Sequence, residues 1–107
     1  MSEQFLCAVE VGAWDIAEGQ KGSCQDCPVA LALLRALRLQ GRDVAEVQVN
    51  GVSIVFWERR GPDLATFIAV THPNLTDWIR DFDQNRPVYP FTVTLEFERE
   101  EYGRAVA

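Results

Sequence analysis

Two cysteines, three positions apart, are the residues whose type and spacing point most directly to chemistry. Cys24 and Cys27 form a C-x-x-C pair, and Pro28 follows at the start of an apolar segment. Proline is favoured at the first position of a helix, so we expect Cys27 to cap a helix N-terminus. The free N–H groups and the helix dipole there can stabilise a thiolate and lower its pKa. One hypothesis is therefore a dithiol redox site at Cys24 and Cys27.

Two features of this segment depart from a thioredoxin-like site. Such sites place the first cysteine at the helix cap, whereas Pro28 places the helix start after the second cysteine. Asp26 lies between the thiols, and its negative charge is expected to raise their pKa values. The alternative interpretation is structural: Cys27 is a small capping residue, Cys24 lies in a loop, and Cys7 is buried in a strand.

A zinc site is a further alternative for the same cysteines. The Cys24 and Cys27 spacing fits one half of a tetrahedral site, but no second local pair supplies the other half. Only Cys7 and His72 remain as ligands, and both would have to converge from separate segments. No motif gives His72 a nucleophile or an orienting acid, and no glycine-rich phosphate loop is present. We therefore expect no resident cofactor and no enzymatic activity, apart from the dithiol alternative.

Composition limits the classes of partner. The chain has 107 residues and a net charge of −6, which disfavours nucleic-acid binding through the phosphates. The odd number of cysteines, three, predicts a reducing cytoplasm rather than a disulfide framework. No apolar run approaches the roughly 20 residues of a membrane span, and the N-terminus lacks a basic signal-peptide start. The sequence thus predicts one cytoplasmic domain over residues 1–107.

The elements that must position these residues follow from apolar periodicity and turn signals. A strand is expected at 5–11, a helical turn at 14–18 and a helix at 28–40 that ends at Gly41. Asn50-Gly51 between two β-branched runs predicts a tight hairpin with positive φ at both residues. Further predicted elements are a strand at 64–70, a helix from Pro73, a strand at 88–98 and a frayed tail at 99–107.

This order predicts an α+β domain, with a mostly antiparallel sheet of about five strands and two helices on one face. The β-α-β-β-β-α-β order is related to a ferredoxin-like arrangement. We expect the first long helix to be a right-handed crossover between two parallel strands.

Several side chains are candidates for contact with a partner. The 28–40 helix is apolar around most of its circumference, so a second layer or a second copy of the chain should cover it. The segments 55–57 and 89–91 are too apolar for simple alternation, so one member of each should face outward. The only basic surplus lies in residues 28–60. The predicted interaction residues are Trp57, Tyr89, Phe91, Arg35 and Arg38.

Cys27-Pro28-Val29-Ala30-Leu31-Ala32 and the terminal Val88-x-Pro90-Phe91 segment carry a resemblance. The chain resembles small uncharacterised proteins encoded by actinobacteria, other G+C-rich bacteria and their phages. These share a C-P-[VI]-A-L-A helix and a terminal V-x-P-F strand. Gln84-Asn85-Arg86 stands where the group is expected to have a glycine in the last turn. The resemblance implies a small cytoplasmic accessory protein.

The function expected from the sequence is a small acidic, non-catalytic accessory protein that binds another protein. It is expected to be a protein–protein interaction module, and a homodimer is one form that it is expected to take. The resemblance suggests a phage-encoded modulator of a host protein. The alternative is a thiol redox or zinc-binding protein that uses Cys24 and Cys27. A third hypothesis is an acidic protein that imitates DNA. It rests only on the regularly spaced carboxylates of Glu96, Glu98 and Glu100.

Overall fold

The computed structural model describes residues 3–100 and has an α+β fold, as the sequence predicts. Five strands form one sheet in the order β1-β5-β4-β3-β2. The strands are β1 (Gln4–Val11), β2 (Val44–Val49), β3 (Ser53–Arg60), β4 (Asp63–Val70) and β5 (Phe91–Arg99). The helices are α1 (Ala13–Glu18), α2 (Pro28–Leu39) and α3 (Pro73–Asp83).

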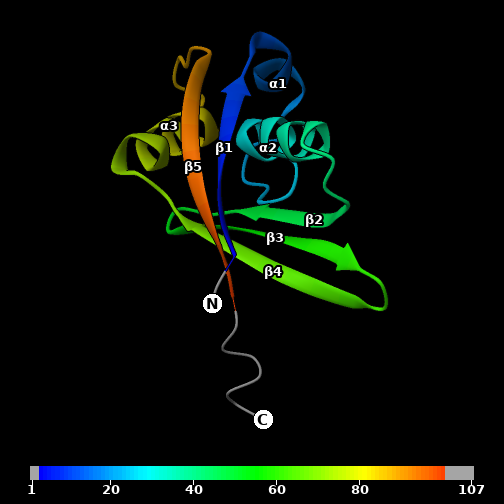
Figure 1. Ribbon diagram of the computed structural model, residues 1–107. Helices are drawn as coiled ribbons and strands as arrows, with labels where there is room; N and C mark the ends of the chain where they lie inside the picture. Colours follow the sequence, from blue (N-terminus) through cyan, green and yellow to red (C-terminus); the bar gives the residue numbers. More distant parts are fainter. Residues whose placement is uncertain (1–2, 101–107) are drawn as a thin grey trace.

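The sheet is divided into two parts that cross at a steep angle (Figure 1). One part is a long ribbon of β1 and β5, whose register runs from the Gln4–Glu98 pair to the Val11–Phe91 pair. The other part is the antiparallel meander of β2, β3 and β4. Helices α2 and α3 lie on the concave side between the two parts, where their apolar side chains complete the core. The two helices expected on one face of the sheet are α2 and α3.

The prediction of a parallel crossover is wrong. Every strand pair in the sheet is antiparallel. Strands β1 and β2, which α2 connects, lie at opposite edges of the sheet. The physical reason is that β5 takes the place beside β1, where its inward-facing side chains extend the core face of β1. Helix α2 therefore spans the concave side from one edge strand to the other.

The predicted hairpin is present, but its turn differs from the expected one. Strands β2 and β3 pair from Val49 and Ile54, and residues 50–52 connect them. Neither Asn50 nor Gly51 has a positive φ. Instead the Asn50 side-chain oxygen accepts hydrogen bonds from the N–H groups of Val52 at 2.9 Å and Ser53 at 2.8 Å. The asparagine side chain thus stabilises the turn in place of the left-handed backbone.

Left-handed residues close two of the helices. Gly41 follows α2 with a φ of 83°, as the sequence predicts. After α3, Asn85 adopts a φ of 62°, which is uncommon for a residue other than glycine. Asparagine tolerates this region better than most residues. Asn85 therefore takes a left-handed conformation that glycine usually adopts at a helix end.

Four phenylalanine rings form the centre of the core where the two parts of the sheet meet. Phe5, Phe56, Phe67 and Phe97 come from β1, β3, β4 and β5, and their contacting ring centroids are 5.0 to 6.0 Å apart. Offset and edge-to-face rings at such distances add to the free energy gained by burial. The rings join strands that share little backbone pairing, because β4 and β5 pair only through Phe67–Arg99 and Ile68–Glu98.

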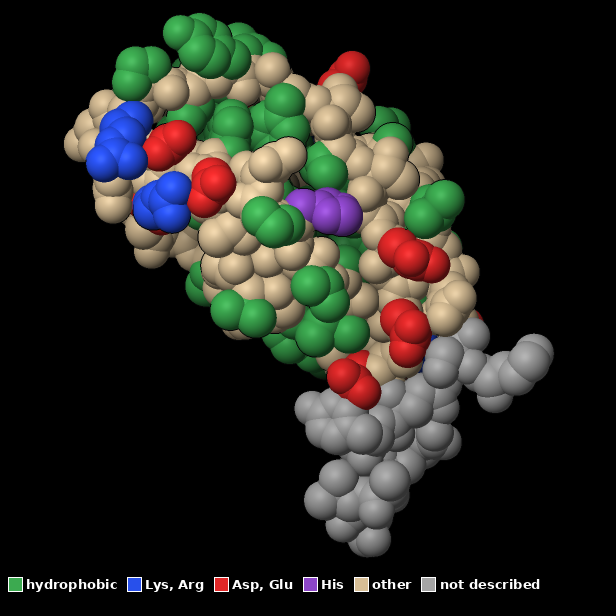
Figure 2. All heavy atoms as spheres, turned by 90° about the vertical axis from the view of Figure 1, so that its left-hand side faces the viewer, with side chains coloured by type: hydrophobic (Ala, Val, Ile, Leu, Met, Phe, Trp, Pro, Cys, Tyr) green, Lys and Arg blue, Asp and Glu red, His purple; other side chains and the backbone are tan. Residues whose placement is uncertain are grey.

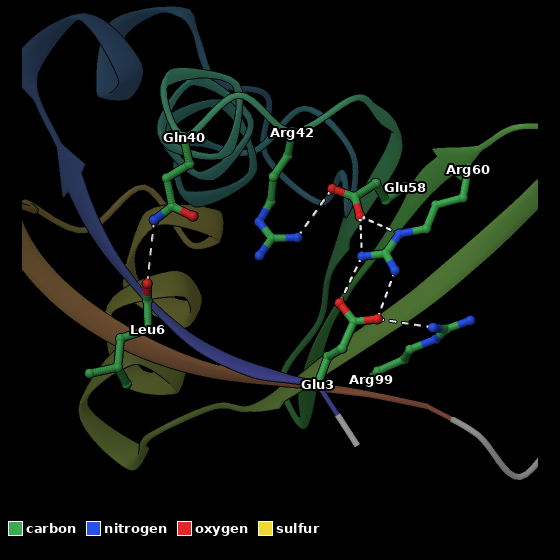
Figure 3. A network of polar contacts seen from close by, with 7 residues as sticks. All are labelled: Glu3, Leu6, Gln40, Arg42, Glu58, Arg60 and Arg99. Carbon is green, nitrogen blue, oxygen red and sulfur yellow. Dashed lines mark hydrogen bonds and ion pairs between the residues drawn. The ribbon is translucent and has the colours of Figure 1, made fainter. Parts of the chain in front are cut away.

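A network of ion pairs lies beside this aromatic cluster, with Arg42 over the Phe5 ring and Arg60 over the Phe67 ring. Figure 3 shows the network. Glu58, an inward-facing residue of β3, is 7% exposed and accepts hydrogen bonds from Arg42 at 3.1 Å and from Arg60 at 2.8 Å. Arg60 also binds both carboxylate oxygens of Glu3, at 2.7 and 2.8 Å. Arg99 binds Glu3 from β5 at 2.9 Å. The network therefore joins the start of β1 and the end of β5 to the β3–β4 hairpin.

The network also includes the first residue of the predicted frayed tail, Arg99. Arg99 belongs to β5, and the Glu100 N–H donates to the Thr66 carbonyl oxygen at 2.7 Å. The prediction that the tail frays from residue 99 is thus wrong for Arg99 and Glu100, because backbone pairing and Glu3 hold them. Residues 101–107 of the predicted tail lie outside the described residues.

Acid should weaken this joint. Hydrogen bonds from Arg60 and Arg99 lower the pKa of Glu3 from 4.5 to about 2. A carboxyl group whose pKa is lowered by folding contributes stability above its unfolded pKa, and this contribution is lost as the pH falls toward the folded value. We expect the free energy of unfolding to decrease from pH 4.5 to about 2, and Glu3→Gln to reduce that dependence. Urea denaturation followed by tryptophan fluorescence at several pH values measures it.

The matched control is Glu18→Gln, which removes an exposed carboxyl group at the end of α1. It should leave the pH dependence between 4.5 and 2 close to that of the wild type. Equal slopes for Glu3→Gln and Glu18→Gln would contradict the assigned role of Glu3.

Candidate functional site

The structure places Cys27 and Cys24 in different environments at the N-terminus of α2. Cys27 is the N-cap residue and is 3% exposed, whereas Cys24 is exposed. Both cysteines are free. The backbone around Cys24 is well anchored, because its carbonyl oxygen accepts a hydrogen bond of 2.7 Å from the N–H of Val49 at the end of β2. The pair therefore combines one accessible thiol with one buried thiol.

Burial changes the expected acidity of Cys27. Loss of solvent raises the pKa of the Cys27 thiol, even though the N–H groups of Val29 and Ala30 favour the thiolate. The expectation that the helix start lowers this pKa is therefore wrong, because desolvation outweighs the helix terminus. The negative charges that add to the effect belong to Asp83 of α3 and to Cys24, not to Asp26 as expected. Cys27 is thus a protonated thiol near neutral pH and a weak nucleophile.

The four alternative zinc ligands do not come together. Residues 3–100 contain no group of three or more His, Cys, Asp or Glu side chains that could hold a metal ion. Cys7 is fully buried in the core from β1, where desolvation raises the pKa of its thiol. His72 is exposed at the N-cap of α3. The core separates these residues, so Cys24 and Cys27 lack the other half of a tetrahedral site.

Alkylation should distinguish the three thiols. We expect iodoacetamide at pH 7.5 to modify Cys24 rapidly, and Cys7 and Cys27 only after unfolding, because the latter two are buried and protonated. Peptide mass spectrometry of the native and the urea-treated protein measures this order. Rapid native labelling of Cys27 would contradict the assignment, and Cys24→Ser controls for labelling at the exposed site.

Arg35, a predicted interaction residue, has an internal role. Its guanidinium binds both carboxylate oxygens of Asp15 at 2.8 Å, and it donates to the Glu10 carbonyl oxygen at 3.1 Å. Asp15 is 1% exposed and also accepts a hydrogen bond of 2.8 Å from the Gly12 N–H. Burial alone would raise the pKa of Asp15, but the hydrogen bonds from Arg35 and from the Gly12 N–H hold it below its usual range. The pair joins α1 to α2 although the Arg35 side chain is 47% exposed, whereas the other predicted arginine, Arg38, is exposed and makes no ion pair within residues 3–100.

This difference predicts unequal effects of two similar substitutions. Arg35→Met leaves the Asp15 carboxylate buried without its partner, so we expect it to lower the free energy of unfolding by about 2 kcal/mol. Arg38→Met, on the exposed side of the same helix, should change it by less than about 0.5 kcal/mol. Urea denaturation of both variants measures the difference. Equal effects would show that the Asp15 pair does not stabilise α1.

The contact between α1 and α2 bears on the predicted homodimer. Helix α1 packs against α2, and the sheet covers another side of it. Leu31, Leu34 and Ala36 are partly exposed, whereas Leu39 is 83% exposed. A second layer within the chain thus covers much of the apolar circumference that suggested a dimer through this helix.

The Tyr89 and Phe91 side chains point in different directions, as expected for a segment without simple alternation. Phe91 faces the core and lies 4.9 Å from the Trp78 ring. Tyr89 is 74% exposed, and its carbonyl oxygen accepts a hydrogen bond of 3.0 Å from the Trp78 indole. An open hollow of about 340 Å³ lies beside this segment, and its lining includes Arg35, Pro90 and Phe91. Its arginine is already bound to Asp15, so the polar side chains of the lining without such a partner are Glu10 and Thr92.

A larger apolar surface lies on the convex side of the meander. On β3, Ile54, Phe56 and Glu58 face the core, so Val55 and Trp57 face outward, as the sequence suggested for one member of that segment. On β4, Ala65, Phe67 and Ala69 face the core. We define the outer meander face as the outward apolar residues of these two strands, which are Val55, Trp57, Leu64, Ile68 and Val70.

The outer meander face has no cover from the described part of the chain. All three helices lie on the other side of β2–β4 in Figure 1. The side chains of the outer meander face range from partly buried, at Val55, Trp57 and Ile68, to 78% exposed at Val70. On the solvent side of an antiparallel sheet, alternation normally places polar residues. Strand β5 follows that pattern with Thr92, Thr94, Glu96 and Glu98, whereas β3 and β4 do not.

The sequence predicts one member of this face, Trp57, as an interaction residue and does not indicate the other four. The missed signal is in residues 64–70, where both alternating sets of side chains are mainly apolar. Such a strand is expected to have apolar contacts on both sides. The number of strands in the sheet and the side taken by the helices were needed to reveal that one side is open.

The two edges of the sheet are less suited to a partner strand than its open face. On β1, the carbonyl oxygens of Leu6 and Glu10 accept hydrogen bonds from the Gln40 and Arg35 side chains. On β2, the register shifts between Val44 and Glu46, and the Val49 N–H is bound to Cys24. Irregular or covered edges of this kind disfavour strand addition.

Comparisons with protein-family models, curated proteins and solved structures find no match to this chain. The resemblance to actinobacterial and phage-encoded proteins therefore stays a prediction. Its residues have clear structural roles, since Cys27 caps α2, Pro28 begins it and Phe91 begins β5. Within residues 3–100, no helix is long and apolar enough to cross a membrane.

Proposed function

We propose that this chain is a small acidic, non-catalytic accessory protein that acts by binding another protein through the outer meander face. The supporting observation is the open apolar side of β3 and β4, described above, in a sheet whose β5 side is polar. An uncovered apolar patch costs solubility, and such patches commonly mark interaction surfaces. The modulation of a host protein, a phage origin and a cytoplasmic location belong to this proposal as expectations from the sequence.

Trp57 is the central anchor of the proposed surface. It is partly exposed, and its register partners are Glu46 on β2 and Thr66 on β4. Tryptophan is among the residues that contribute most to binding when a partner desolvates them. Because Trp57 lies on the middle strand of a paired meander, its backbone is fixed before binding, which limits the entropy lost on association.

Photocrosslinking tests this function. A photoreactive benzoylphenylalanine at Thr66, beside Trp57, should crosslink a partner protein when the chain is expressed in the cells that encode it. The same group at Ala17, exposed on α1, should not. Trp57→Thr preserves strand propensity and should reduce the Thr66 product at least about tenfold, as for an interface hot spot.

Leu39→Gln is the matched control, because Leu39 is 83% exposed at the end of α2, on the helix side of the sheet. It should leave the yield at Thr66 unchanged. Equal loss with both variants, or no protein product at Thr66, would contradict the proposed function. A product of twice the chain mass would instead identify the predicted homodimer and place it on this face.

The thiol alternative has one favourable observation, since Cys24 lies near enough for its charge to raise the pKa of Cys27. A Cys24–Cys27 disulfide would leave both residues unreactive to iodoacetamide until a reductant is added. The alkylation experiment above therefore also separates this alternative from the binding proposal.

A further inference from the structure

Most basic side chains of the described chain are already used in internal contacts. Ion pairs engage Arg35, Arg42, Arg59, Arg60, Arg80, Arg86 and Arg99. The Lys21 ammonium lies 4.8 Å from the centre of the Phe82 ring. Since the whole chain carries a net charge of −6, the charge left free at the surface is mainly negative.

Part of this free negative charge lies on the outer side of the β1–β5 ribbon. Glu96 and Glu98 occupy successive outward positions of β5, about 7 Å apart along the strand. Glu10 faces the same side from β1, where it is paired with Thr92. None of these three carboxylates has an ion-pair partner within residues 3–100. Acidic side chains are seen along the right-hand margin of Figure 2.

The acidic ribbon and the outer meander face adjoin each other. Ile68 of β4 is the register partner of Glu98 of β5, so an apolar and an acidic side chain stand side by side on the outer surface. The Gln4 side chain donates a hydrogen bond of 3.1 Å to the Glu98 carboxylate. The Glu98 side chain makes no other hydrogen bond or ion pair within the described residues. A partner that covers Ile68 and its neighbours would therefore also approach Glu98 and Glu96.

We infer that the partner of the outer meander face is a basic protein, with apolar side chains for β3 and β4 and Lys or Arg side chains for β5. This inference rests on the proposed function and adds the chemistry of the partner. Apolar contact over Trp57 and Ile68 supplies the binding energy. The carboxylates of Glu96 and Glu98 steer a basic partner and penalise an acidic one, a second copy of this acidic chain included.

Crosslinking from both halves of the surface tests the inference. Benzoylphenylalanine is placed at Thr66 in the apolar half and, in a second variant, at Thr94, the outward residue of β5 next to Glu96. We expect both to crosslink the same protein, and the peptide joined at Thr94 to carry a surplus of Lys and Arg. Raising the salt from about 0.05 to about 0.3 M should reduce the yield several-fold, because screening weakens surface charge contacts.

Two double variants with the same net charge separate local from overall charge. Glu96→Gln with Glu98→Gln, and Glu18→Gln with Asp26→Asn, each remove two carboxylates from the chain. The first should lower the Thr94 yield about fivefold at low salt, and the second less than twofold. Equal effects, a neutral or acidic peptide at Thr94, or a product of twice the chain mass would overturn the inference.

The outcomes distinguish this inference from the proposed function. A Thr66 product that persists with a partner lacking basic residues near Thr94 would leave the binding function standing and refute the basic partner. If benzoylphenylalanine at Thr66 gives no protein product at all, both the binding function and the basic partner are refuted.

Discussion

The joint between β4 and β5 is the contact on which the rest of the structure depends. Only two residue pairs connect these strands, so backbone pairing contributes little at the point where the two parts of the sheet cross. Four phenylalanine rings in stacked and edge-to-face contact lie under the joint, and the carboxylates of Glu3 and Glu58 hold three arginines over it. The Arg42 guanidinium lies 3.6 Å from the Phe5 ring centre, which connects the charged and aromatic layers. Removing a partner would leave a buried or half-buried charge, which costs more than an exposed ion pair gives.

The two parts of the sheet have different outer surfaces. On the ribbon, the outward side chains of β5 are threonines and glutamates, whereas those of β1 are of mixed type and include the exposed Leu6. The meander is paired internally as the ribbon is, yet most outward side chains of β3 and β4 are apolar. The steep crossing keeps the helices on the concave side and leaves that apolar surface uncovered by residues 3–100. The proposed binding surface is therefore on the sheet rather than on the helices or on the cysteine segment.

Burial decides the chemistry of the cysteine segment. The same helix start that favours a thiolate also removes Cys27 from water, and the second effect dominates its pKa. Asp83 of α3 adds to it, and the N–H of Gly22 anchors that carboxylate at 2.9 Å. The loop before α2 thus connects α2, α3 and the end of β2, and Cys24 takes part through its backbone carbonyl.

Local sequence determined the type of nearly every element, because the helices at Pro28 and Pro73, the Asn50 hairpin and the alternation of 91–98 depend on neighbours in the chain. It also indicated that Trp57 and Tyr89 have no place in a simple alternating pattern. Only the tertiary structure decided the strand order, the burial of Asp15 and Glu58, and the internal role of Arg35, since each depends on residues distant in sequence. The outer meander face belongs to the same class. A strand with two apolar sides is compatible with a buried centre or an open surface, and the side on which the helices pack decides between them.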